Sequence, residues 1–152
     1  MVDEMKFYSQ HELTPADYGY VLMDLNADDS PELIFTNVNK DTVFAIFTLK
    51  DGRPELLDCY WSRCTAVILD DGTVYTMGSG GWDTTEFVFY VVDSQIPALK
   101  RTSAFGCQDG VYYRETSGQR MSSNQDLYYS MLSSYPYEFG WTWYQQEVIT
   151  LQ

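Results

Sequence analysis

One acidic stretch of the chain has the residue types and the spacing to bind a hard metal ion. Asp24, Asn26 and Asp28 alternate along it, and Ser30 and Glu32 continue the same spacing. Alternate residues of a tight loop can direct oxygen atoms at one centre, and Ca²⁺ takes about six to eight oxygen ligands. We expect side-chain oxygens from Asp24, Asn26 and Asp28, a backbone carbonyl from Ser30 and a closing carboxylate from Glu32. The stretch therefore predicts a calcium site, with a structural rather than a catalytic role.

The spacing of these residues does not fit an EF-hand, but it resembles the spacing in another kind of calcium loop. An EF-hand needs Gly at its sixth position and Glu at its twelfth, and counting from Asp24 these positions hold Asp29 and Phe35. Residues 18–35 instead resemble the D-x-N-x-D-G-x-x-E-L calcium-type hairpin loops of FG-GAP and VCBS-like repeats and of small secreted bacterial domains. Asp29 replaces the Gly of that pattern, and Asp tolerates the left-handed backbone conformation better than most residues. The resemblance implies a secreted or surface protein of bacteria with a structural calcium ion.

A solvated acidic turn that binds no metal is the alternative interpretation of this stretch. Asp, Asn, Ser and Pro are ordinary turn residues, so their presence alone does not require an ion. A motif of this kind is a hypothesis that needs its structural context.

The rest of the sequence offers few groups for catalysis. His11 is the only histidine and lies in a polar segment without an evident partner, whereas a catalytic His needs a nucleophile and an orienting group. Asp83 and Glu86 could pair as acid and base, but chance pairs are common in a chain so rich in carboxylates. We expect no enzymatic activity.

The odd number of cysteines (Cys59, Cys64 and Cys107) argues against a full disulfide framework and favours buried free thiols.

Charge limits the kinds of partner. The formal net charge of −13 disfavours direct binding to nucleic acid and to anionic membranes. No apolar run is long enough to insert into a membrane. The acidity favours a cation or a basic protein partner.

The N-terminus lacks a signal-peptide pattern, so we expect a cytoplasmic protein, or an extracellular or cell-surface protein if a signal peptide was removed.

The hydrophobic pattern predicts a single, mainly β domain with one C-terminal α-helix. Turn signals recur about every ten residues between runs rich in Val, Ile, Phe, Tyr and Thr, which is typical of an antiparallel meander or sandwich-like sheet. We expect an N-terminal segment (1–17), a β meander (18–118), a helix (122–135) with apolar residues on one stripe, and a tail (136–152). The expected strands are 18–24, 32–38, 42–49, 54–61, 64–69, 73–77, 84–92, 98–105 and 111–115.

Aromatic residues near turns are candidates for contact with a partner. Trp82 and Trp141 each lie beside Gly at an expected turn, so at least one should be exposed. If the tail is extended, Trp141 and Trp143 share one face. Gly78–Gly81 is expected to form a hairpin tip.

These features favour a non-enzymatic binding domain with a protein partner. One alternative is an intracellular acidic inhibitor of a basic target, such as an immunity protein, an anti-CRISPR or another nucleic-acid mimic. A third interpretation is a carbohydrate-binding module that stacks exposed aromatic rings on a glycan.

Overall fold

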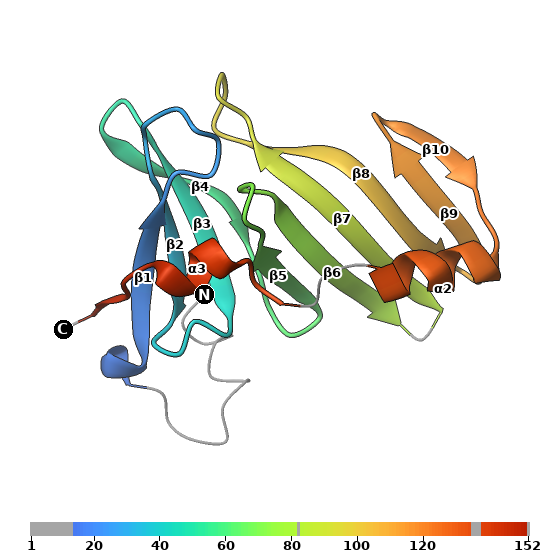
Figure 1. The fold of residues 1–152 in the computed structure, drawn as a ribbon, viewed down its shortest axis with the longest axis horizontal. Helices are drawn as coiled ribbons and strands as arrows, with labels where there is room; N and C mark the ends of the chain where they lie inside the picture. Colours follow the sequence, from blue (N-terminus) through green and yellow to red (C-terminus); the bar gives the residue numbers. More distant parts are fainter. Residues whose placement is uncertain (1–13, 82, 135–137, 152) are drawn as a thin grey trace.

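The computed structural model describes residues 14–81, 83–134 and 138–151, and these form two antiparallel sheets side by side (Figure 1). The prediction of a mainly β fold with a C-terminal helix is confirmed. Sheet A has the strand order β11-β1-β2-β3-β4, and sheet B has the order β10-β9-β8-β7-β6-β5. Sheet A comprises β1 (Tyr18–Met23), β2 (Glu32–Asn37), β3 (Val43–Lys50), β4 (Arg53–Cys59) and β11 (Ile149–Thr150). Sheet B comprises β5 (Cys64–Ile68), β6 (Val74–Gly81), β7 (Thr84–Val92), β8 (Leu99–Gln108), β9 (Val111–Thr116) and β10 (Gln119–Ser122).

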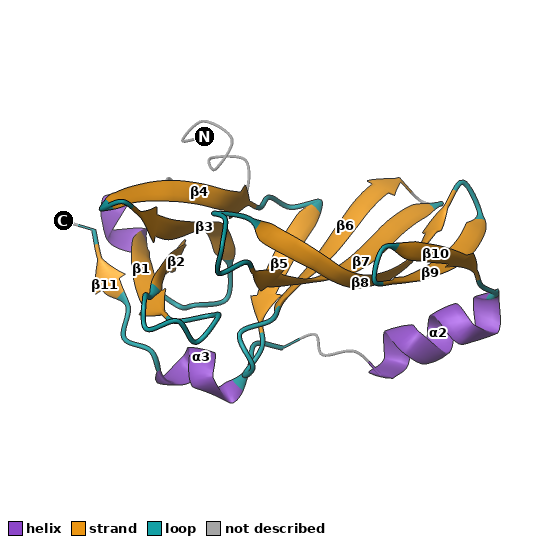
Figure 2. Cartoon of the chain, turned by 90° about the horizontal axis from the view of Figure 1, so that it is seen from above, coloured by secondary structure: helices purple, strands orange, loops and turns teal. Residues whose placement is uncertain are grey.

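Within the described ranges, three short helices accompany the sheets. The 3₁₀ helix η2 (Pro15–Asp17) precedes β1, α2 (Gln125–Ser134) follows β10, and α3 (Trp141–Gln145) precedes β11. Figure 2 shows α2 and α3 on the same side of the molecule. Among the described residues, no helix has the length and apolarity that a bilayer crossing requires.

The half of sheet B that lies away from sheet A forms an aromatic core, and α2 covers it. The Phe87 and Phe105 rings stack with centroids 4.6 Å apart, and Tyr128 and Met131 of α2 pack against this cluster. The Asn124 side-chain oxygen accepts a hydrogen bond from the Leu127 amide at 2.8 Å, which caps the helix. The expected apolar stripe of the helix therefore meets the sheet.

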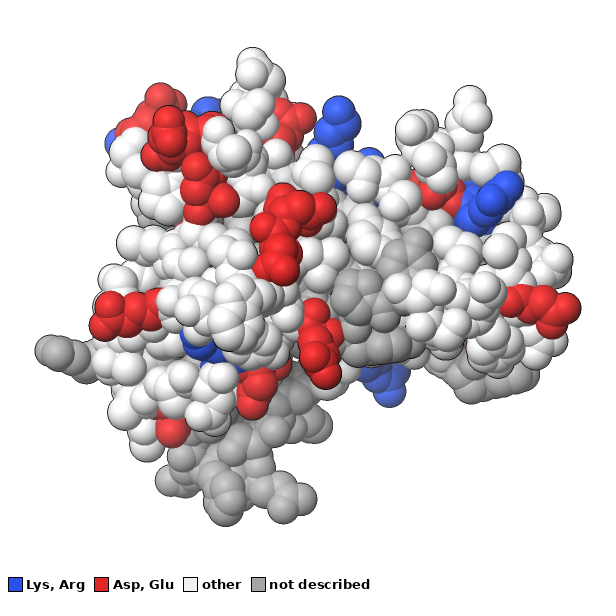
Figure 3. Space-filling view, viewed as in Figure 1, with Lys and Arg blue, Asp and Glu red and all other residues white. Residues whose placement is uncertain are grey.

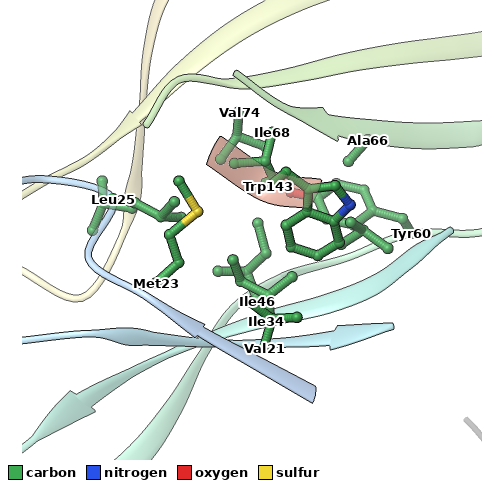
Figure 4. Packing of buried hydrophobic residues seen from close by; sticks show 12 residues of the cluster. Val21, Met23, Leu25, Ile34, Ile46, Tyr60, Ala66, Ile68, Val74 and Trp143 are labelled. Carbon is green, nitrogen blue, oxygen red and sulfur yellow. The ribbon is translucent and has the colours of Figure 1, made fainter. Parts of the chain in front are cut away.

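The main core lies where the two sheets meet, and Trp143 of α3 is at its centre (Figure 4). Val21 and Ile34 approach Trp143 from sheet A, and Ile68 and Val74 approach it from sheet B. The indole Nε1 donates a hydrogen bond to the Lys40 carbonyl at 2.9 Å. Alternation along β1 and β2 sends one set of side chains into this core and the other set to the opposite side of sheet A.

Several details of the chain differ from the sequence-based expectations. Gly78–Gly81 is not a hairpin tip, because β6 continues through it and Ser79 pairs with Thr85 of β7. The tail is not extended over residues 141–145 but helical, so Trp141 and Trp143 point in different directions and only Trp143 is buried. The strands β10 and β11 were not among the expected ones.

An acidic loop and an adjoining cleft

The predicted calcium loop is the connection between β1 and β2, and Asp24 organises it. One carboxylate oxygen of Asp24 accepts hydrogen bonds from the amides of Asn26 (3.3 Å) and Asp28 (3.2 Å). The other oxygen accepts from the Asp29 amide at 2.9 Å. The backbone of the loop therefore wraps around this carboxylate.

Asn26 and Asp28 complete the turn. The Asn26 side-chain oxygen accepts a hydrogen bond from the Asp28 amide at 3.2 Å, and its Nδ2 donates to the Asp28 carboxylate at 3.0 Å. The Ser30 amide donates to Asp28 at 2.9 Å. Asp29 has φ = 66°, so the residue that replaces Gly does adopt the left-handed conformation. The structure thus gathers three of the four predicted side-chain ligands in one turn.

Glu32 lies below the loop, on the buried side of sheet A. Its side chain is only 1% exposed. One oxygen accepts a hydrogen bond from the Leu25 amide at 3.0 Å, and the other accepts from the Thr48 hydroxyl at 3.1 Å. Burial raises the pKa of this carboxyl, and the two hydrogen bonds oppose that rise. Glu32 therefore joins the base of the loop to β3, a contact that the loop spacing alone does not reveal.

Calcium ligation by this loop stays a prediction. Across residues 14–81, 83–134 and 138–151, no group of three or more His, Cys, Asp or Glu side chains is arranged to hold a metal ion. The predicted set also counts an amide oxygen from Asn26 and a backbone carbonyl from Ser30. Both are ligands that Ca²⁺ accepts in addition to carboxylates, but they bring no charge to the site. Both oxygens of Glu32 already accept hydrogen bonds, so an ion at this loop would have to share them.

The loop borders an open cleft of about 620 Å³ between the two sheets and α3. The turn at Gly72 packs so closely on the loop that a Cβ atom there would collide with the Leu25 carbonyl. The Thr142 amide donates to the Asp70 carboxylate at 2.7 Å, and this bond lowers the pKa of Asp70. The polar residues that line the cleft are Asp24, Asn26, Asp70, Asp71, Thr142 and Gln146.

An exposed tryptophan is adjacent in sequence to a residue that lines this cleft. Trp141 is 72% exposed, and it precedes Thr142, which lines the cleft. This confirms the expectation that at least one of the two candidate tryptophans is exposed. Trp82 lies outside the described residues, as does His11.

A polar cluster on sheet B was not found from the sequence. Arg101 donates to Glu86 at 2.7 Å and to Glu115 at 2.8 Å, and the Tyr113 hydroxyl donates to Glu86 at 2.5 Å. The Arg120 guanidinium lies 3.9 Å from the centroid of the Tyr113 ring. These residues come from four neighbouring strands, so only the strand register could have predicted their contact.

The ionisation states of this cluster suit a structural ion-pair network rather than acid–base catalysis. Burial acts to raise the pKa of Glu86, but the hydrogen bonds from Arg101 and Tyr113 outweigh it, so the pKa lies below its usual value. Burial and the Glu86 carboxylate raise the pKa of Tyr113. A carboxylate that stays ionised and a phenol that stays protonated are poorly matched to proton transfer near neutral pH.

The three cysteines are free and partly buried. Burial and the neighbouring Asp58 raise the pKa of Cys64, which disfavours the reactive thiolate.

Comparison of the chain with protein-family models, curated proteins and solved structures found no match. Its function must therefore be inferred from its own sites.

Proposed function

We propose that this chain is a non-enzymatic binding domain whose β1–β2 loop holds a structural calcium ion. The observation that carries the proposal is the gathering of Asp24, Asn26 and Asp28 in one turn. The negative charges of Asp24 and Asp28 repel each other, and a bound cation would relieve that repulsion. An extracellular or cell-surface location, as in the bacterial domains that the loop resembles, would supply calcium at the concentration that weak sites need.

Thermal unfolding in calcium and in chelator tests this proposal. An ion that binds only the folded chain stabilises it by about 2.7 kcal/mol at 100 times its dissociation constant. For a domain of this size that corresponds to a rise in melting temperature of roughly 5–10 °C. Asp28→Asn should abolish the rise, whereas Asp51→Asn, at the β3–β4 turn, should keep it. Equal melting in calcium and in chelator would count against the proposal.

The charge of the molecule favours a second candidate, an acidic inhibitor of a basic protein. Within the described part of the chain, every ion pair involves Glu86 or Glu115. Figure 3 shows acidic side chains far more often than basic ones on the visible face. Carboxylates without basic neighbours can face the cations of a partner. Tight binding to a basic nuclease that weakens steeply with salt would support this candidate.

The exposed Trp141 favours a third candidate, a glycan-binding module. An aromatic ring beside polar oxygens is the arrangement that stacks on a sugar and hydrogen-bonds its hydroxyls. Quenching of tryptophan fluorescence by one member of a glycan panel, lost in Trp141→Ala, would support it. An unresponsive panel would argue against it.

A further inference from the structure

Sheet A is apolar on both sides, and only one side belongs to the core. On the other side the strand register places Leu22 opposite Leu33, Leu33 opposite Phe47, and Phe47 opposite Leu56. These four residues form one row across β1, β2, β3 and β4. We use the name outer face for this surface, which comprises Tyr18, Tyr20, Leu22, Leu33, Phe35, Phe44, Phe47 and Leu56.

A cluster of three aromatic rings adds to the row. The centroids of Tyr18 and Phe35 lie 5.6 Å apart, and the centroid of Phe44 lies 5.6 Å from that of Tyr18 and 5.7 Å from that of Phe35. Contacting rings at these spacings favour a surface that is already ordered before a partner arrives.

No described element buries the outer face. Its residues belong to neither hydrophobic core cluster. Leu22 and Leu56 are 45% and 49% exposed, and the other six residues are half-buried. A sheet that faces water on one side usually places polar residues there. A contiguous apolar surface of this kind marks a site of interaction.

The size of the outer face suits a single helix. The row crosses three inter-strand steps, or about 14 Å at about 4.8 Å per step. At about 1.5 Å per residue, this is the length of a helix of roughly nine residues, whose apolar anchors recur every three to four residues. A second copy of the chain is a poorer fit, because it carries the same net charge of −13 and would be repelled.

The charges around the outer face indicate which charged residues the polar side of that helix should carry. The loops at the ends of these strands contain the exposed carboxylates of Asp28, Asp29, Asp41 and Asp51. Figure 3 shows acidic side chains over the end of sheet A where the β1–β2 loop and the β3–β4 hairpin lie in Figure 1. The ammonium group of Lys40 lies on the other side of sheet A, where it donates to three carbonyls at α3.

Lys50 and Arg53 are exposed basic residues at the β3–β4 hairpin, so apart from Lys40 the positive charge in these strand-end loops lies at that one corner. The loops elsewhere around the outer face carry carboxylates, which favour a cationic partner.

We propose that the outer face binds the apolar side of a basic amphipathic helix from a partner protein. Apolar anchors of the helix would cover the Leu22–Leu56 row, and its Lys and Arg residues would face the carboxylates at the strand ends. This proposal deepens the proposed binding function and rests on it, but it does not depend on calcium.

A synthetic peptide of about 16 residues, with Leu at helical spacing and Lys elsewhere, tests the proposal by fluorescence anisotropy. The full chain should bind this peptide more weakly as salt rises, and should not bind a Leu/Glu peptide or a scrambled Leu/Lys peptide. The double variant Leu22→Gln, Leu56→Gln should weaken binding about tenfold or more, because both anchor contacts are lost. Val111→Gln is the matched control: Val111 is 64% exposed on β9, and its substitution should change nothing.

Four outcomes would overturn the proposal. The double variant could bind the peptide as well as wild type does, or the scrambled peptide could bind equally well. Light scattering could show a dimer of the chain that the double variant dissociates, which would identify a second copy as the occupant. Binding could require removal of residues 1–13, which would mean that the chain covers this face itself. The calcium response of the double variant should match wild type, so failure here is distinguishable from failure of the calcium proposal.

Discussion

The Glu32 carboxylate lies where the acidic loop joins sheet A, with one oxygen on the Leu25 amide and the other on the Thr48 hydroxyl. A buried carboxylate is easier to keep protonated than a solvated one. Glutamine could keep both contacts, with its oxygen accepting from Leu25 and its amide group donating to the hydroxyl of Thr48. The residue can therefore be neutralised without removing its packing.

We predict that Glu32→Gln changes the pH dependence of stability. Burial raises the pKa of Glu32 above the ordinary value of 4.5, so the folded chain keeps this proton to higher pH than the unfolded chain. The stability it contributes is complete below pH 4.5 and is lost as pH rises through the folded pKa. In chelator, the free energy of unfolding of wild type should therefore fall relative to Glu32→Gln above pH 4.5. Urea unfolding at a series of pH values measures this, with Glu55→Gln as control, and parallel pH profiles would contradict it.

At the scale of elements, the turn between β5 and β6 positions the acidic loop by close contact. Gly72 has φ = 80°, and a Cβ atom there would meet the Leu25 carbonyl. Gly110 has φ = 78° with no atom near its missing Cβ. The two glycines share a backbone conformation and differ only in their surroundings.

Alanine substitution at these two glycines should therefore give unequal losses. Gly110→Ala pays only for the left-handed conformation, about 1 kcal/mol of unfolding free energy. Gly72→Ala adds the collision with Leu25, for a total of about 2–4 kcal/mol. Urea unfolding of both variants gives the comparison, and equal losses would show that the turn does not pack on the loop.

The short helix α3 depends on a residue distant in sequence. Lys40 Nζ donates to the carbonyls of Tyr144 at 2.8 Å and of Gln146 at 2.7 Å. Five residues form too few helical hydrogen bonds to be stable alone. Lys40 therefore helps to hold Trp143 in the core.

Lys40→Met keeps the length of the side chain and removes its donors. We predict a loss of about 1–2 kcal/mol of unfolding free energy, since hydrogen bonds from a charged donor contribute more than neutral ones. Lys50→Met, at the exposed end of β3, is the control and should be nearly neutral. An equally small effect at Lys40 would mean that α3 is held by Trp143 alone.

The elements that the sequence predicted are those set by local pattern. Runs rich in β-branched and aromatic residues, separated by turn signals, located nine strands, and one apolar stripe located α2. The strand β11 has two residues and exists through its pairing with Gly19 and Tyr20. Contacts between distant residues such as these leave no periodic signal in the sequence.

The features of the candidate site also fall into local ones, which the sequence predicted, and long-range ones, which it did not. The acidic turn around Asp24 is local, so residue spacing predicted it, including the left-handed position at Asp29. The burial of Glu32, the cleft beside Asp70 and the outer face of sheet A depend on strand register and on the packing of one sheet against the other. Such features are seen only after the chain is folded.

At the scale of the whole molecule, a net charge of −13 coexists with a large apolar core and an apolar outer face. Self-repulsion of this size opposes folding, and counter-ions or a bound cation relieve it. A calcium ion at the β1–β2 loop would act where Asp24 and Asp28 concentrate that charge.

A calorimetric calcium titration of the chelator-stripped protein tests the central claim most directly. Wild type and Asp51→Asn should each bind one calcium ion, and Asp24→Ala and Asp28→Asn should not. Asp24 accepts three backbone hydrogen bonds and Asp28 accepts one, from Ser30, so Asp28→Asn disturbs the fold of the loop less than Asp24→Ala does. If wild type takes up no calcium, or if Asp28→Asn binds it as tightly as wild type, the loop is an acidic turn and the calcium proposal is wrong.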